Sequence, residues 1–541
     1  MMTGHGNHEN GHKVWIYFLS LLLCAALLFL VGLGKRDLWP PDEPRVAGIA
    51  AGMGISGDMV VPRLNGEPFL EKPPLYFWAA SGAFNLLGEN TFAARIPAAL
   101  AAICVIALVF FLARSMGFSS FTAIVSGFIL ATSAGYWALG RSCVVDMMLC
   151  LFTTCAMVCF FHTSRTLSRK ALWYLGFILS LSCAVMTKGL VGIAIPLSAL
   201  TVWLLLEKNF SLRAWGLLSL SPALCLVPAA IWIWFLYNNL GWDAVYEVFW
   251  TNNFGRFTGS HHHHIQPFYY YITRFPQKLF PWVLFLPFSL VYHLREMLEQ
   301  ESEKHFLFFL SWLVVPFILL SISGAKRGLY LLPLYPAAAL LVGTAVGRAL
   351  EKGETSTKLF SIPSVILLGS IILASLGFCG MCIYLEQPFF VCLLVSFPGL
   401  CLGVWAYRQL TRKDLLRFFM ILAAALVALF LTFDIGIAPL SNQKNSYGPL
   451  FKYFEKFRSD GARMSLFKPS ERLRGAAVFY LKRTVPVIRE GEELKDFLCS
   501  EKKAVAISRK TNLKNFNALD IMNTFIVRNK TIVFVRDNHV D

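Results

Sequence analysis

Long apolar runs alternate with short polar segments along most of this chain, from residue 14 to residue 437. A helix needs about 20 apolar residues to cross the hydrocarbon core of a bilayer, and most of the runs come close to that length. Backbone groups in lipid must find hydrogen bonds within their own segment, so such runs are expected to be helical. The pattern predicts about thirteen membrane-spanning helices, at residues 14–33, 92–113, 121–139, 144–161, 172–186, 190–206, 215–237, 279–292, 306–322, 329–346, 362–384, 389–406 and 415–437.

The pattern changes after Pro439, where short alternating runs replace the long apolar ones. Ser470 followed by Glu471 suits the start of a helix, and Asn529 with Lys530 suits a hairpin turn. We expect a small soluble α/β domain in this part of the chain. Its predicted strands are residues 463–467, 504–508, 524–528 and 531–536, and a predicted helix covers residues 470–482.

Composition supports this division of the chain. Of the 541 residues, 56% are hydrophobic and only 15% are charged, which is more apolar surface than a soluble domain of this size needs. The sequence therefore predicts an all-α polytopic membrane protein with a small C-terminal soluble α/β domain. The membrane domain is predicted at residues 1–440, with outer loops at 35–91 and 238–278, and the soluble domain at residues 441–541.

Lys and Arg residues indicate how the chain is oriented. The formal net charge is +17, and in a membrane protein such an excess points to cytoplasmic loops and anionic lipid headgroups, not to nucleic acid. A cytoplasmic N-terminus places most of these cations in cytoplasmic loops, in agreement with the positive-inside rule. An odd number of spans then puts residues 441–541, and every candidate residue named below, on the outer (periplasmic) face of the inner (plasma) membrane.

The polar stretch from Lys35 to Trp78 is the clearest candidate for a functional loop. It holds the acidic pair Asp42 and Glu43 between prolines, and the ion pair Glu71 and Lys72 beside Pro73-Pro74. Proline fixes φ, so these charges stand on stiff backbone, as a pre-organised site requires. A solvated loop with tight turns accounts for these residues equally well.

The order of residues in this loop resembles a known family. The patterns DLWPPDEPR and SGDMVVPRLNGEPFLEKPPLYFW are similar to the first periplasmic loop of the aminoarabinose transferase and protein O-mannosyltransferase family. The resemblance covers nearly all of the membrane part and does not extend to the C-terminal tail. It implies a GT-C fold and a glycosyltransferase that takes a sugar from a polyprenyl (undecaprenyl) phosphate carrier. It also implies that Asp42 is the general base, with Glu43 in a supporting role.

Arg141 and Asp146 stand at the outer end of a predicted span. Ionisable groups at membrane depth are costly unless they face protein or water, which makes a functional role the default. A structural ion pair between helices is the alternative. The family resemblance implies that Asp146 assists the active site and that Arg141 supports it.

The second outer loop contains four consecutive histidines and the sequence FGRF. The resemblance singles out Arg256 as a ligand of the donor phosphate, and His264 with Glu71 as ligands of a divalent metal such as Zn, Mg or Mn. A run of solvated histidines explains the same residues. The chain has Asn252-Asn253 where many family members carry a histidine, which separates it from the family pattern at this point.

Lys326, Arg327 and Tyr330 form a third group at the outer rim of a span. Two cations and a phenol suit a phosphate, with Arg as a bidentate donor and Lys as a point charge. Snorkelling of the cations to lipid headgroups is the alternative. Together with Lys72 and Arg256, these residues make a predicted phosphate-binding site flanked by carboxylates.

This inventory predicts an enzyme that transfers a sugar from a polyprenyl phosphate to lipid A, protein or another glycan of the cell envelope, with inversion. The cations and Tyr330 would stabilise the leaving phosphate, while Asp42 accepts the proton of the attacking hydroxyl. Expected partners are the lipid-linked donor, the acceptor and membrane lipids, and we expect a monomer. A transporter or flippase of an anionic lipid is the competing prediction, and it should place charged groups near the bilayer midplane.

Overall fold

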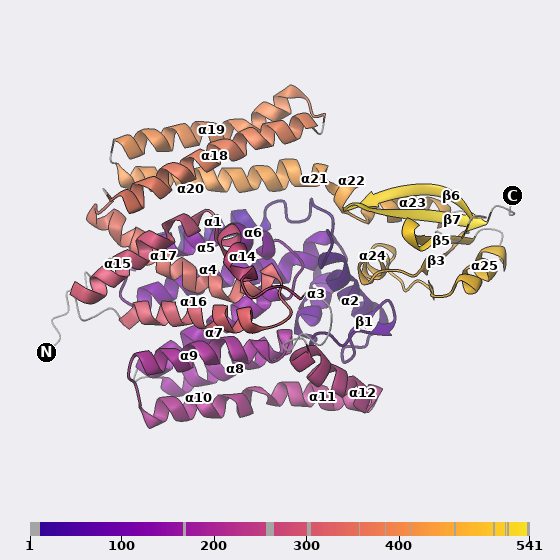
Figure 1. Ribbon diagram of the computed structural model, residues 1–541, viewed down its shortest axis with the longest axis horizontal. Helices are drawn as coiled ribbons and strands as arrows, with labels where there is room; N and C mark the ends of the chain where they lie inside the picture. Colours follow the sequence, from indigo (N-terminus) through magenta and orange to yellow (C-terminus); the bar gives the residue numbers. More distant parts are fainter. Residues whose placement is uncertain are drawn as a thin grey trace. The chain divides into compact units, whose positions relative to one another are not determined.

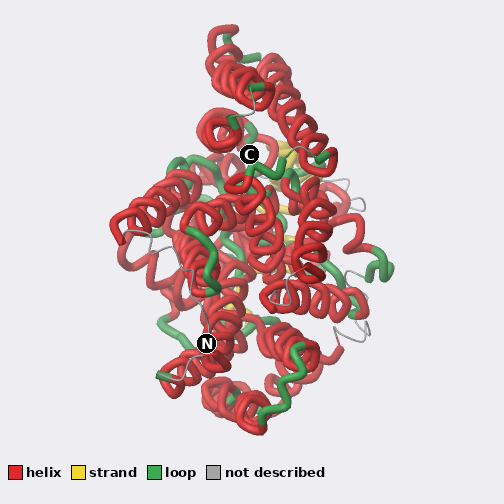
Figure 2. Tube along the Cα trace, turned by 90° about the vertical axis from the view of Figure 1, so that its left-hand side faces the viewer, coloured by secondary structure: helices red, strands yellow, loops and turns green. Residues whose placement is uncertain are grey.

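The computed structural model describes residues 11–165, 169–255, 265–299, 304–355, 357–384, 386–412, 414–458, 461–500, 504–513, 516 and 519–537. Helices make up most of these described residues, and the strands among them form one short hairpin and one sheet (Figures 1 and 2). The chain forms two compact units. The helical unit comprises Met1–Val31, Glu71–Pro73 and Ala98–Phe433, and the loop–sheet unit comprises Gly32–Leu70, Pro74–Pro97 and Asp434–Asp541.

All thirteen predicted spans are helical, but not all are long enough to cross a bilayer. Within the described ranges, ten helices are long and apolar enough, and α5 (Ser120–Ala131) with α6 (Ala134–Gly140), bent by 69°, makes an eleventh candidate. These findings confirm a multi-span, all-α membrane protein. The other candidate spans are α1 (Gly11–Leu30), α4 (Thr91–Ser115), α7 (Asp146–Arg165), α8 (Lys170–Lys188), α10 (Leu212–Cys225) with α11 (Val227–Leu240), α16 (Lys304–Ile322), η3 (Gly328–Leu334) with α17 (Tyr335–Lys352), α18 (Lys358–Tyr384), α19 (Phe389–Thr411) and α20 (Leu415–Thr432).

Two predicted segments fall short of a span. Residues 190–206 form α9 (Val191–Leu206), which has 16 residues, and residues 279–292 form η2 (Trp282–Phe285) and α15 (Leu286–Glu299), which has 14 residues. At 1.5 Å per residue these helices are shorter than the hydrocarbon core is thick. The predicted count of about thirteen therefore exceeds the ten or eleven candidates because apolar composition does not distinguish a short buried helix from a spanning one.

Helix α17 is the most buried span of the helical unit. Its glycines Gly343 and Gly347 lie directly against α5, where an added Cβ would come within 2.4 Å of Ser126 and 2.7 Å of Thr122. Small residues at such points let the backbones of membrane helices approach closely. Elsewhere in this unit α18, α19 and α20 run side by side (Figure 1).

The loop–sheet unit combines the first outer loop with the C-terminal part of the chain. The loop forms α2 (Glu43–Ser56), the hairpin β1 (Arg63–Leu64) and β2 (Glu67–Pro68), and α3 (Leu75–Leu87). The C-terminal part forms a five-stranded sheet in the order β4-β3-β5-β7-β6, parallel for β4-β3-β5 and antiparallel for the rest. Its elements are η4 (Phe433–Ile437), α21 (Ala438–Leu440), α22 (Asn442–Asn445), α23 (Gly448–Arg458), β3 (Arg463–Phe467), α24 (Glu471–Leu481), β4 (Val487–Ile488), α25 (Gly491–Ser500), β5 (Ala504–Arg509), η5 (Lys510–Leu513), β6 (Leu519–Val527) and β7 (Lys530–Asp537).

Local sequence signals place β3, β5, β7 and α24 well, whereas β6 begins at Leu519 instead of residue 524 and the following turn is shifted. Ser470 is the N-cap of α24, and its side chain accepts a hydrogen bond from the Leu473 amide. The hairpin turn lies one residue earlier than predicted: Arg528 and Asn529 both have positive φ, and Lys530 already pairs with Val527 in the sheet. A two-residue turn with positive φ at both positions matches the twist of the flanking strands. The turn therefore forms at Arg528-Asn529, although Asn529-Lys530 has the higher turn propensity.

Candidate functional site

Asp42 stands immediately before helix α2 in the loop–sheet unit. Pro44 occupies the first turn of α2, where its missing amide hydrogen costs nothing, and this fixes where the helix begins. The Asp42 side chain does not cap the helix; one carboxylate oxygen lies 3.0 Å from Nη2 of Arg45, one turn along α2. Only 14% of the Asp42 side chain is exposed. The candidate base is thus held beside a guanidinium on rigid helical backbone.

Glu43, the neighbouring carboxylate, lies in a different environment. It is buried between Arg36 and Arg95, whose guanidinium nitrogens approach its oxygens to 2.9 and 2.7 Å, and it accepts the Trp39 amide hydrogen at 2.9 Å. Burial alone would raise the pKa of the Glu43 carboxyl, but the charges of Arg36 and Arg95 outweigh it and lower the pKa to about 2. Glu43 is therefore ionised at neutral pH, where it anchors the loop and is a poor proton acceptor.

Arg95 connects the ion pairs around Glu43 to the backbone of the preceding residues. Its side chain is fully buried and donates to the carbonyl oxygens of Leu33, Arg36 and Asp37 at 2.6–2.8 Å. A buried charge is tolerated only when it is paired and hydrogen-bonded, and Arg95 meets both conditions. The cluster thus holds the loop backbone that leads into Asp42.

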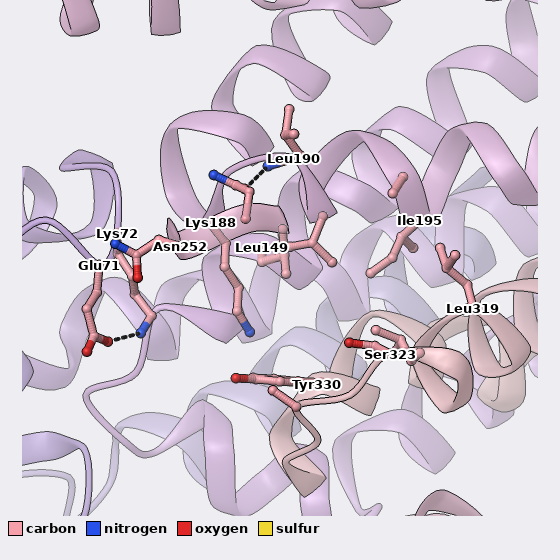
Figure 3. Close-up of a pocket in the computed structure, with 15 residues that line it drawn as sticks. Glu71, Lys72, Leu149, Lys188, Leu190, Ile195, Asn252, Leu319, Ser323 and Tyr330 are labelled. Carbon is pink, nitrogen blue, oxygen red and sulfur yellow. Dashed lines mark hydrogen bonds and ion pairs between the residues drawn. The ribbon is translucent and has the colours of Figure 1, made fainter. Parts of the chain in front are cut away.

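A cavity of about 310 Å³ lies within the helical unit. One end is polar, with Glu71, Lys72, Lys188 and Tyr330, and the rest is mainly aliphatic (Figure 3). A charged head with an apolar wall is the chemistry that recognises an anionic amphiphile. The remaining lining residues are Leu149, Leu190, Val191, Ala194, Ile195, Asn252, Asn253, Leu319, Leu320, Ser323 and Ala325.

Lys188, the last residue of α8, is central to the polar end of the cavity. Its ammonium forms an ion pair with Asp146, the first residue of α7, and lies 3.9 Å from the centre of the Tyr330 ring. Figure 3 shows the Lys188 and Tyr330 side chains next to each other. Asp146 is buried, so it fixes the ammonium in place. Lys188 was not among the predicted site residues, although a lysine at the end of a span, next to Gly189, could have indicated it.

Glu71 and Lys72 reach the cavity from the first outer loop. The Lys72 ammonium lies 3.9 Å from the Glu71 carboxylate, and both side chains are largely buried. Figure 3 shows this pair at one edge of the cavity, opposite the aliphatic side chains of Ile195 and Leu319. Lys72 and Lys188 therefore bring two positive charges to the same polar end.

Asn253 has a structural role at the junction of α8 and α9. Its side-chain oxygen accepts the Leu190 amide hydrogen at 3.0 Å, and its amide donates to the Val248 carbonyl at 2.8 Å. Gly189 between the helices has a φ of +74°, and a Cβ there would lie 2.6 Å from the Asn253 oxygen. Asn253, which stands where many family members carry a histidine, thus stabilises the turn that orients Lys188.

The third predicted group is only partly at the cavity. Tyr330 lines it, whereas Lys326 and Arg327 are not among its described lining residues. The buried Lys326 ammonium donates to the Gln266 carbonyl at 2.9 Å, and Arg327 is the N-cap of η3 in extended conformation. Arg141 donates to the carbonyls of Leu28 and Val31 at the end of α1, which satisfies acceptors that the helix leaves open.

Two predicted site residues, Arg256 and His264, lie outside the described residues. Among the residues that the structure does describe, no three or more His, Cys, Asp or Glu side chains gather in a way that could hold a metal ion. The described part of the predicted metal site is Glu71 alone, which faces Lys72.

The chain is similar to known membrane glycosyltransferases in both sequence and structure. Residues 14–240 match the family described as dolichyl-phosphate-mannose-protein mannosyltransferase. The undecaprenyl phosphate-alpha-4-amino-4-deoxy-L-arabinose arabinosyl transferase of Erwinia tasmaniensis is 32% identical over 330 residues, 60% of this chain and 58% of that protein. The corresponding protein of Edwardsiella ictaluri is 32% identical over 335 residues, 61% of this chain and 59% of that protein. The matched region thus spans less than two thirds of these relatives.

The structural likeness extends over almost the whole chain. The crystal structure of ArnT from Cupriavidus metallidurans bound to undecaprenyl phosphate superposes with a TM-score of 0.73 and 19% identity, covering 97% of this chain and 98% of that one. At this identity the likeness establishes the fold, which is the GT-C fold that the loop motif implied. The comparisons confirm the resemblance of this chain to the family of aminoarabinose transferases and protein O-mannosyltransferases.

Proposed function

We propose that this protein is an integral membrane glycosyltransferase that transfers a sugar from undecaprenyl phosphate to an acceptor of the cell envelope. The cavity of the helical unit carries this proposal, because it joins two lysines and a phenol to an aliphatic wall. The names of the relatives support it, since they are arabinosyl transferases of an undecaprenyl phosphate donor. The active site is proposed to face the periplasm from the inner membrane.

The polar end and the aliphatic wall of the cavity would bind different parts of the donor. The aliphatic side chains of α9 and α16, such as Ile195 and Leu319, suit the first isoprene units of the carrier. The ammonium groups of Lys72 and Lys188 suit its phosphate. In a site away from bulk water these charges attract a phosphate more strongly than they would at an exposed surface.

The chemical step releases the carrier phosphate, which gains negative charge as the bond to the anomeric carbon breaks. Fixed positive groups that face this charge lower the barrier, because they stabilise the transition state more than the bound donor. Lys72 and Lys188 would supply the charges and the Tyr330 hydroxyl a hydrogen bond. Asp146 would keep Lys188 in place. Lys326, Arg327 and Arg256 remain predicted phosphate ligands.

Asp42 is the proposed general base. The acceptor hydroxyl attacks the anomeric carbon on the face opposite to the leaving phosphate, and Asp42 takes its proton. A single displacement of this kind inverts the configuration of the anomeric carbon. An acceptor phosphate group, as in lipid A, would arrive already ionised and would need the base less.

The position of the charged groups argues against the competing transporter. A carrier of anionic lipids should place charged groups or broken helices near the middle of the membrane. Asp146 is the first residue of α7 and Lys188 is the last residue of α8. The charged end of the cavity is therefore built from helix termini, where a donor headgroup would lie.

Binding of undecaprenyl phosphate without a sugar tests the donor site. Losing a charge-assisted contact costs about 1.5–3 kcal/mol, so Lys72→Ala and Lys188→Ala should each weaken binding about tenfold to a hundredfold. Lys352→Ala is a matched control, since Lys352 also pairs with a carboxylate, Glu296 at 3.2 Å, and lies over a tyrosine ring. Unchanged affinity in both pocket variants, with the fold intact, would contradict the proposed site.

The sugar and the acceptor require a separate measurement. The names of the relatives make 4-amino-4-deoxy-L-arabinose the first donor sugar to test. Lipid A, one of the acceptors predicted from the sequence, is the first acceptor to test. Mass spectrometry of envelope lipids and glycoproteins from cells with and without the gene should show one added sugar that depends on the gene. An identical envelope in both strains would contradict a transferase role.

A divalent metal held by Glu71 and His264 is a further proposal, which follows from the family resemblance. The one described ligand, Glu71, faces an ammonium instead of further carboxylates or imidazoles, and no step above uses a metal. If Glu71 and His264 do hold one, chelation should lower activity, and the double variant Glu71→Ala, His264→Ala should lose bound metal. Full activity after exhaustive chelation would exclude a catalytic metal.

A further inference from the structure

We propose that Glu471, in the C-terminal part of the chain, is a positioning residue that sets the basicity and orientation of Asp42 through Arg45. The inference rests on the proposed function, because it takes Asp42 as the general base. It assigns a role in the reaction to the C-terminal domain, to which the family resemblance of the sequence does not extend.

The three side chains form a chain of charges within the loop–sheet unit. Arg45 directs Nη2 to Asp42 at 3.0 Å and Nη1 to Glu471 at 2.8 Å. Its side chain is only 13% exposed, and its guanidinium lies 5.6 Å from the centre of the Phe69 ring. One guanidinium therefore binds both carboxylates at once, and neither can move without affecting the other.

The backbone fixes Glu471 in this place. Helices α2 and α24 cross with Gly48 against Gly475: a Cβ on Gly48 would lie 2.3 Å from the Gly475 carbonyl oxygen, and a Cβ on Gly475 would lie 2.4 Å from that of Pro44. Glu471 is the first residue of α24, after the Ser470 cap, where the helix dipole favours a negative charge. The register of the crossing thus sets which residue of the C-terminal domain faces Arg45.

Charged groups near Glu471 and Asp42 on the same elements have different partners. On the loop, Glu43 binds Arg36 and Arg95. On α24, Arg474 forms an ion pair with Glu67 of β2, which Arg489 also binds. Glu471 is therefore the acidic group of α24 that acts on the guanidinium beside Asp42.

Sharing the guanidinium has a direct electrostatic consequence. With Glu471 ionised, the positive charge of Arg45 is divided between two carboxylates, so Asp42 keeps more of its basicity. Without that charge, less of the positive charge of Arg45 is offset, which favours the ionised form of Asp42 and lowers its pKa. A weaker base accelerates proton transfer less. Glu471→Gln should therefore lower kcat and move the acid limb of the pH profile to lower pH, with KM for the donor unchanged.

The test compares two carboxylates of the same unit in the full-length protein, reconstituted in liposomes. Glu471→Gln should lower kcat several-fold, up to about tenfold for a pKa change of one unit, and shift the acid limb, while Glu471→Asp restores part of both. Glu67→Gln is the control, because Glu67 is about as exposed as Glu471 (44% against 42%) and likewise pairs with arginine, but with Arg474 and Arg489 instead of Arg45. A merely structural role of these ion pairs would give both variants the same effect.

A second readout is independent of turnover. Infrared titration of the carboxyl groups, with Asp42→Asn as the reference that identifies the Asp42 signal, should show a lower Asp42 pKa in Glu471→Gln than in the wild type. An unchanged Asp42 pKa and an unchanged pH profile would overturn the inference, and so would the same shift in Glu67→Gln. If Asp42→Asn retains full turnover, the proposed base is wrong, and this outcome is distinct from a failure of Glu471 alone.

Discussion

Asp42 and Glu43 are adjacent in the sequence, yet their surroundings give them different chemistry. Glu43 is 4% exposed and held by two arginines, whereas Asp42 is 14% exposed beside Arg45. Two adjacent carboxylates in one apolar pocket would repel each other, and the separate partners remove that conflict. The sequence alone could not identify Arg36 and Arg95 as the partners of Glu43, because Arg95 is 52 residues away.

Replacing Glu43 by Gln should destabilise the protein without a specific effect on chemistry. Removing one partner of a buried ion pair typically costs about 3–5 kcal/mol, since the other charge stays buried. The pKa of Glu43 is lowered from 4.5 to about 2, so its stabilising charge is fully present above pH 4.5 and is lost as the pH falls towards 2. Thermal unfolding of wild type and Glu43→Gln should therefore differ at neutral pH and converge over this interval. A constant difference down to pH 2 would contradict the ion cluster.

Replacing Asp42 by Asn should affect turnover and leave donor binding near normal. The amide keeps the shape of the side chain but cannot accept the proton, and general-base catalysis is worth about 10²–10⁴-fold. The measurement is kcat for transfer alongside the affinity for undecaprenyl phosphate. A larger loss in Glu43→Gln that is not explained by unfolding would show that Glu43 is the base.

At the scale of elements, apolar periodicity predicted most helices and strands, but it did not predict features that depend on packing between elements. All thirteen apolar runs are helical, and β3, β5 and β7 lie where alternation placed them, while β6 (Leu519–Val527) begins before the strand predicted at 524–528. The predicted number of spans was too high because apolar composition does not distinguish a short buried helix from a spanning one. The turn at Arg528-Asn529 was shifted because the type of turn depends on the twist of the two strands that it joins. The Lys188–Asp146 pair joins two helices 42 residues apart, and no local pattern reports such a contact.

The crossing of α2 and α24 gives a sharp test at this scale. Gly475→Ala would push a methyl group into the backbone of Pro44, and overpacking of this kind typically costs about 1–3 kcal/mol. Gly82→Ala in α3 is the control, because nothing lies within 4 Å of its added Cβ. Thermal unfolding should show a lower midpoint for Gly475→Ala and an equal or higher one for Gly82→Ala. Equal midpoints for Gly475→Ala and wild type would contradict the close crossing.

At the scale of the whole molecule, the fold was within reach of the sequence and the orientation remains a prediction. The loop motif implied the GT-C fold, and the likeness to ArnT confirms it. Side-chain geometry of the donor cavity was only partly foreseen: Glu71, Lys72 and Tyr330 were named, while Lys188 and the aliphatic wall follow from how α8, α9 and α16 pack. Charge bias between loops is the physical basis for placing the N-terminus in the cytoplasm.

A reporter fused after Asp541 tests that orientation. A reporter that functions only outside the cytoplasm should be active there, and one that functions only in the cytoplasm should be silent. The converse pattern would place the C-terminal domain in the cytoplasm and remove the periplasmic site.

Reconstituted transfer tests the central claim most directly. Purified protein in liposomes is given undecaprenyl phosphate-linked 4-amino-4-deoxy-L-arabinose and lipid A, or an extract of the source cell's own lipid-linked sugars and envelope acceptors. Mass spectrometry should detect glycosylated acceptor and free undecaprenyl phosphate in equal amounts. The variants Lys72→Ala and Asp42→Asn should transfer the sugar more slowly than the wild type, and the control Lys352→Ala should transfer it at the wild-type rate. If the folded wild-type protein releases no undecaprenyl phosphate from either donor preparation, the result would contradict the claim that this protein is a glycosyltransferase.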